Sequence, residues 1–76
     1  MKLLSEMEIG TSGIVKSLKA EGKIKRRLYD MGITPGAKIV VKKFAPLRDP
    51  IEITLRGYEL SLRLEEAKCI EMEEVK

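Results

Sequence analysis

Few residues in this 76-residue chain could bind a transition metal. Dedicated sites for such ions usually combine histidine nitrogen or cysteine thiolate with carboxylates. The sequence has no histidine, and its single cysteine, Cys69, precedes an isoleucine that we expect to face inward. Carboxylates gather near the C-terminus, at Glu65, Glu66, Glu71, Glu73 and Glu74. Carboxylate oxygens alone would hold divalent ions weakly and with little selectivity. We therefore expect no metal site, no cofactor and at most weak divalent metal binding.

Catalytic residues are equally scarce. Nucleophilic catalysis needs an activated side chain beside a base, which is most often histidine. Without histidine, and with no Ser or Cys in a recognisable activation motif, no such arrangement can be assembled. The phosphate-binding motif GxxxxGK(S/T) is absent too. We expect a protein that is not an enzyme and binds no nucleotide.

Basic side chains are concentrated in the first part of the chain. Residues 1–44 carry ten Lys and Arg against four acids, whereas residues 45–76 carry five against eight. Four of the basic residues fall within five positions, namely Lys23, Lys25, Arg26 and Arg27. A basic surface of this kind can meet acidic protein surfaces, phosphates or anionic lipid headgroups. A solvated face without a partner is the alternative.

The composition indicates one folded domain that occupies residues 1–76, with 43% hydrophobic and 36% charged residues. A domain of this size buries only about 60% of the surface that its unfolded chain exposes, which leaves little room for a deep cleft. No stretch approaches the roughly 20 apolar residues of a membrane span. The lone cysteine cannot form an internal disulfide, so we expect a cytoplasmic protein that is not inserted in a membrane.

One short helix is predicted at about residues 23–31. Ile24, Leu28 and Met31 recur at helical spacing and define the face that we expect to pack inward. Arg26 and Asp30 are placed to form an i,i+4 ion pair. Gly32 can end the helix in a left-handed conformation. Thr34-Pro35-Gly36-Ala37 then predicts a type II turn, because proline favours its second position and glycine its third.

Alternating apolar residues predict about five short strands, at Ser12–Leu18, Lys38–Phe44, Ile51–Arg56, Tyr58–Arg63 and Cys69–Val75. Gly57 allows a tight hairpin, and residues 64–67 are typical of one helical turn. Together these elements favour a mainly β fold, a small and partly open barrel. The predicted core consists of Val15, Ile24, Leu28, Ile39, Val41, Ile53, Leu55, Leu60, Leu62 and Ile70.

Three segments carry a family resemblance. KRRLYDMGITPGAKI, KKFAPLRDPIEI and LRGYELSLRLEEAKCI resemble, in order and without gaps over residues 9–75, the FeoA family, the small cytoplasmic component of bacterial ferrous iron uptake. The resemblance implies an SH3-like barrel, related to the C-terminal domain of DtxR-type repressors. It also implies a non-enzymatic accessory role at the cytosolic side of FeoB, a membrane permease with a G-protein domain.

Two segments are candidates for contact with that permease or its G-domain. The first is the basic helix, with Lys23, Lys25, Arg26 and Tyr29, where a tyrosine could serve as an amphipathic anchor. The second is the proline-bracketed connection, with Pro46, Leu47 and Arg48, whose stiffness would reduce the entropy lost on binding.

Two other functions stay open: a small basic barrel that binds nucleic acid, and a metal-linked regulatory SH3-like module as in DtxR-type repressors. Nucleic-acid binding is less expected, because single-strand sites stack bases on surface aromatics and this chain has only three aromatic residues. The sequence also leaves a weak homo-oligomer open.

Overall fold

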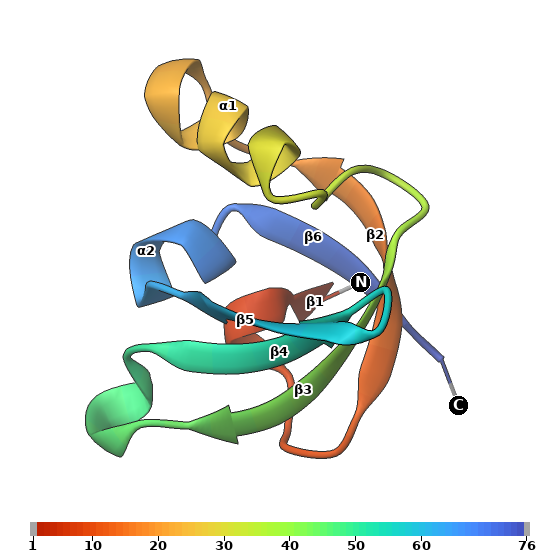
Figure 1. Ribbon diagram of the computed structural model, residues 1–76, viewed down its shortest axis with the longest axis vertical. Helices are drawn as coiled ribbons and strands as arrows, with labels where there is room; N and C mark the ends of the chain where they lie inside the picture. Colours follow the sequence, from red (N-terminus) through yellow and green to blue (C-terminus); the bar gives the residue numbers. More distant parts are fainter. Residues whose placement is uncertain (1, 76) are drawn as a thin grey trace.

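The computed structural model describes residues 2–75 as a small barrel with helices along one side (Figure 1). In chain order its elements are β1 (Lys2–Leu3), the 3₁₀ helix η1 (Leu4–Glu6), β2 (Ser12–Leu18), α1 (Gly22–Asp30), β3 (Lys38–Phe44), the 3₁₀ turn η2 (Pro46–Arg48), β4 (Ile51–Leu55), β5 (Tyr58–Leu62), α2 (Leu64–Ala67) and β6 (Ile70–Val75). The predicted strands and the helical turn at 64–67 are confirmed, and the short β1 is an addition.

Within the described residues, one antiparallel sheet has the strand order β1-β6-β2-β3-β4-β5. Two register shifts interrupt it, between Val15 and Ser17 of β2 and between Val41 and Lys43 of β3. Such bulges bend and twist a sheet, which helps this one to curl into a barrel. Arg56 and Gly57 both have positive φ, 51° and 87°, and join β4 to β5 as a two-residue hairpin loop.

The core fills the inside of this curled sheet. Eight of the ten predicted core residues are buried, all but Ile24 and Leu60. Leu60 is half-buried and packs against the core from the edge strand β5. The sequence reading missed several further buried side chains, namely Leu4, Met7, Ile33, Ala37 and Ala67. All five lie outside the strands, where no period-2 pattern marks them.

The prediction that Ile24 lies in the core is wrong, because its side chain is 37% exposed. Leu28 is the buried residue of α1, and Met31 packs beside it at the helix end. Figure 1 gives the physical reason: the end of α1 meets the barrel while its start projects beyond it. The predicted helix end and turn are confirmed, since Gly32 and Gly36 have φ of 91° and 93° and the Ala37 amide donates to the Thr34 carbonyl at 3.0 Å.

Candidate docking surface

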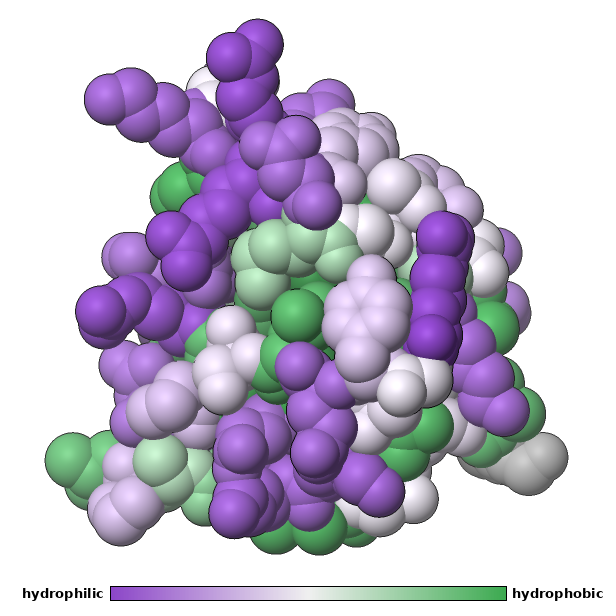
Figure 2. Space-filling view, viewed as in Figure 1, coloured by the Kyte–Doolittle hydropathy of each residue, from purple (hydrophilic) through white to green (hydrophobic). Residues whose placement is uncertain are grey.

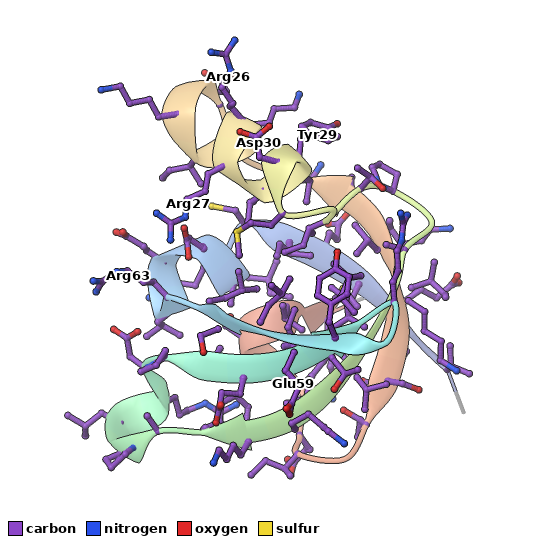
Figure 3. All side chains as sticks on the ribbon, viewed as in Figure 1. Arg26, Arg27, Tyr29, Asp30, Glu59 and Arg63 are labelled. Atoms are coloured by element: carbon purple, nitrogen blue, oxygen red, sulfur yellow. The ribbon has the colours of Figure 1, made fainter. Side chains whose placement is uncertain are left out.

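Exposed basic side chains make α1 a strongly charged part of the surface. Lys23, Lys25 and Arg26 are exposed, and Tyr29 beside them is 42% exposed. The Lys25 ammonium lies 5.9 Å from the centre of the Tyr29 ring, a cation–π contact that orders both side chains. Figure 3 shows Arg26 pointing away from the barrel, and Figure 2 shows hydrophilic side chains projecting over this part of the surface. The four helix residues predicted as contacts are thus all exposed on α1, and Lys25, Arg26 and Tyr29 line one shallow hollow.

The charges on α1 are not arranged for helix stability. Lys23 and Lys25 lie in the first turn and Arg26 at the middle of the helix, the first turn holds no acidic residue, and Glu21 at the N-cap makes no side-chain capping bond. The N-terminus of a helix carries partial positive charge, so a cation in the first turn, such as Lys23, costs about 0.3–1 kcal/mol. The predicted ion pair of Arg26 with Asp30 does not form within 4.0 Å among the described residues.

Arg27 forms an ion pair that the sequence did not predict. Its Nε lies 2.9 Å from Oε2 of Glu66 in α2, and the Glu66 side chain is only 6% exposed. The other carboxylate oxygen of Glu66 accepts a hydrogen bond from the Arg63 amide at 2.9 Å. One buried carboxylate therefore caps α2 and ties α1 to it. The Arg63-x-x-Glu66 spacing of a capping box was the available signal, but the residue at its N-cap is arginine instead of Ser or Thr.

A shallow hollow lies below Arg27 and is lined by Arg27, Asp49, Pro50, Ser61, Leu62 and Arg63. Asp49 Oδ1 accepts a hydrogen bond from the Leu64 amide at 3.1 Å, which fixes one rim of the hollow. In Figure 3, Arg27 and Arg63 lie on the same side of the molecule, between α1 and the η2 turn. The hollow therefore lies between α1 and the proline-bracketed connection, to which it is linked through Arg27 on one side and Asp49 and Pro50 on the other.

The second predicted contact segment, η2, exposes Leu47, whereas the side chain of Arg48 contacts other parts of the protein. Leu47 is 93% exposed. The Arg48 guanidinium donates to the backbone carbonyls of Ser5 and Met7, at 3.0 and 3.3 Å, and stacks 4.0 Å from the centre of the Phe44 ring. Arg48 thus fastens the turn to the barrel, whereas Pro46 at the start of the turn is exposed and fixes its entry.

The C-terminal carboxylates are dispersed by the strand alternation of β6. Glu71 accepts a hydrogen bond from the Ser17 hydroxyl at 3.0 Å, Glu73 pairs with Lys16 at 3.6 Å, and Glu74 pairs with Lys2 at 3.1 Å. The Cys69 thiol donates to the Glu65 carbonyl at 3.3 Å. Across residues 2–75, no group of three or more His, Cys, Asp or Glu side chains is arranged to hold a metal ion.

This arrangement suits recognition by surface contact. It offers exposed cations together with the exposed side chains of Tyr29 and Leu47, which are typical components of a protein interface. In the described part of the chain, no helix is both long and apolar enough to cross a membrane.

Comparison with known proteins identifies the family. The model of the FeoA domain matches residues 2–74. The chain belongs to the FeoA family. A FeoA-like protein from Clostridium acetobutylicum, solved by NMR, is 44% identical with a TM-score of 0.89, covering 96% of this chain and 85% of that one. FeoA of Stenotrophomonas maltophilia, solved in complex with zinc and described as a prokaryotic SH3 domain protein, is 27% identical with a TM-score of 0.82, covering 96% and 91%. The predicted SH3-like fold is confirmed.

A curated relative joins this kind of domain to a transporter. The Fe(2+) transport protein A/Fe(2+) transporter FeoB fusion protein of Porphyromonas gingivalis is 37% identical over 70 residues, which is 92% of this chain. This FeoA-family chain spans only 8% of that fusion protein's length. A manganese-dependent transcriptional repressor also shares the fold, with a TM-score of 0.91 over 97% of this chain and 36% of that one. At 18% identity the likeness concerns the fold alone.

Proposed function

We propose that this FeoA-family protein is a non-enzymatic accessory protein of ferrous iron uptake that docks on the cytosolic part of a FeoB-type permease. The observation that carries the proposal is the fusion protein, in which a segment 37% identical to this chain is covalently joined to a FeoB transporter. Domains fused in one organism often associate as separate chains in another. A cytosolic docking site would place the protein in the cytoplasm.

The basic face of α1 supplies the charge for such docking. Lys23, Lys25 and Arg26 are exposed, and among residues 2–75 none of the three forms an ion pair within 4.0 Å. Lys23 lies in the first turn of α1, where a cation works against the helix dipole, so helix stability does not explain its presence. Exposed cations of this kind can steer an acidic partner surface into register and raise the association rate.

Charge reversal tests the proposal. The variant with Lys23→Glu and Arg26→Glu should bind a purified FeoB-type permease several-fold more weakly and associate more slowly. The fold should survive, because neither side chain is buried. Added salt should weaken the wild-type complex in the same way, since exposed charges are screened over about 10 Å at 0.1 M.

The matched control reverses two other exposed lysines, Lys38 and Lys42, on strand β3. It changes net charge by the same amount, so a general charge effect would weaken both variants equally and remove α1 from the docking surface. Growth on limiting ferrous iron tests the function as a whole. If deletion of the gene leaves ferrous iron uptake unchanged, the proposed function is wrong.

A further inference from the structure

The η2 turn displays one apolar side chain to solvent. Leu47 is 93% exposed, the highest value among the large exposed hydrophobic residues within residues 2–75. Figure 2 shows hydrophobic atoms projecting where Figure 1 places η2, at the lower left. A single exposed leucine is ordinary on a protein surface. Leu47 differs from such a residue in its backbone conformation and in the contacts that the next residue, Arg48, makes.

The backbone of the turn is held in a conformation that side chains disfavour. Leu47 and Arg48 have φ of 66° and 62°, two successive non-glycine residues in the left-handed region. Such residues persist only where the surrounding structure enforces them, and they concentrate at sites of ligand contact. Glycine or asparagine would satisfy the same backbone more easily. The local backbone conformation therefore does not explain why a leucine occupies this position.

The contacts of Arg48 hold the turn in this conformation. Its guanidinium binds the Ser5 and Met7 carbonyls and stacks on Phe44, so it crosses from the turn to the start of the chain. On the other side of the turn, the Ala45 amide donates to the Pro50 carbonyl at 3.0 Å, which closes the base of the loop. The position of Leu47 is thus fixed before any partner arrives, which lowers the entropy lost on binding.

We propose that Leu47 is the apolar anchor of the docking surface and that it inserts into a leucine-sized apolar pocket on the acidic cytosolic surface of the permease. This inference rests on the proposed function. Arg48 is the positioning residue that holds the anchor. The hollow lined by Arg27, Asp49 and Arg63 connects the η2 turn with α1, so one partner can contact the anchor and the basic helix together.

A protein pocket fits this anchor better than a lipid surface does. Stable membrane attachment needs two strong signals, and one leucine side chain supplies much less than an acyl chain. A rigid single side chain is instead suited to a preformed pocket, where well-packed anchors carry most of the binding energy.

The test uses the full chain and the purified permease in detergent, with affinity measured by biolayer interferometry. Leu47→Asn removes the apolar side chain and suits a left-handed backbone, whereas Leu47→Met keeps an apolar side chain. Burial of a leucine corresponds to an affinity change of about 10- to 100-fold, so we expect such a loss for Leu47→Asn and less than about threefold for Leu47→Met. Ile9→Asn, which removes another exposed apolar residue, is the control and should bind as wild type.

Arg48 is tested through its coupling to Leu47. Arg48→Ala should weaken binding in the wild-type background and have little further effect in the Leu47→Asn background, because it acts by holding Leu47 in place. A purely structural role would give equal losses in both backgrounds and would overturn this part. Urea unfolding of Leu47→Asn should show a midpoint at or above that of wild type, which excludes misfolding as the cause of weaker binding.

Three results would contradict the proposal that Leu47 is the apolar anchor. If wild type binds the permease and Leu47→Asn binds equally well, the anchor is wrong while the proposed function stands. If wild type does not bind the permease at all, both the anchor and the proposed function are wrong. If Leu47→Asn instead abolishes flotation with vesicles that contain anionic phospholipid, and leaves permease binding intact, the leucine contacts lipid.

Discussion

Glu66→Ala is the substitution that most directly tests how the two helices are held. Glu66 is buried, with 4% of the residue exposed. One oxygen of its carboxylate accepts a hydrogen bond from the Arg63 amide, and the other forms an ion pair with the Arg27 side chain. Removing the carboxylate leaves the Arg63 amide, at the N-cap of α2, without its partner and removes the ion pair that links α1 to α2. Glu65, the preceding residue of the same helix, is exposed and makes neither contact, so Glu65→Ala is a matched control.

The expected cost follows from these contacts. Loss of a capping hydrogen bond costs about 1 kcal/mol. The ion pair adds less than a fully buried pair would, because Arg27 is 63% exposed and solvent screens it, so we assign it about 0.5–1 kcal/mol. The sum is about 2 kcal/mol, which is a large fraction of the ~3–5 kcal/mol that so small a core supplies. For a domain of this size it corresponds to a fall in Tm of roughly 8–16 °C.

Urea unfolding followed by circular dichroism measures this cost. Glu65→Ala should stay within about 0.5 kcal/mol of wild type, as other exposed substitutions do. Glu66→Gln keeps an acceptor for the Arg63 amide but loses the charge, so it should cost less than Glu66→Ala. A double-mutant cycle with Arg27→Ala isolates the pair. Equal unfolding midpoints for Glu65→Ala and Glu66→Ala would refute the reasoning.

Two further predictions concern the core and metal. Truncation of Ile53 or Leu62 to alanine should cost about 2–5 kcal/mol, enough to unfold much of the protein, and loss of the far-UV strand signal on mild warming would show it. Anaerobic calorimetric titration with Fe²⁺ should show no tight one-to-one binding, because the chain has no histidine and three of its C-terminal acids already pair with Arg27, Lys16 and Lys2. A submicromolar one-to-one isotherm would disprove it.

The strands could be predicted because their pattern is local. Ile51, Ile53 and Leu55 alternate with polar residues, and a strand with one buried face requires that alternation. The turns were predictable for a similar reason, since Gly32 and Gly36 supply a backbone conformation that few other residues adopt. Which residues of the helix are buried could not be predicted from local sequence alone. Ile24 has the right spacing for an inward face, but the barrel does not extend far enough to cover it.

The contacts of the arginines could not be predicted either. Arg27 reaches Glu66 across 39 positions of the sequence, and Arg48 reaches Ser5 across 43. Nothing in the sequence spacing identifies such partners, because they depend on how the chain returns to itself in three dimensions. The sequence therefore predicted both Arg26 and Arg48 as candidate contacts for a partner. The structure separates them, since Arg48 is engaged with the barrel and Arg26 is not.

The same separation divides α1 into a structural and a recognition part. A nine-residue helix is marginal alone, and α1 has Leu28 as its buried residue and Arg27 as its ion-pair link to α2. Arg27 is thus accounted for by stability, whereas Lys23 in the first turn opposes the helix dipole, and Arg26 forms no ion pair within 4.0 Å among the described residues. Arg27→Ala should consequently raise amide exchange throughout α1, and reversal of Lys23 and Arg26 should weaken docking without raising exchange. If the charge reversal instead loosens the helix as much as Arg27→Ala does, the basic residues belong to the fold, and Leu47 alone would remain as the docking contact.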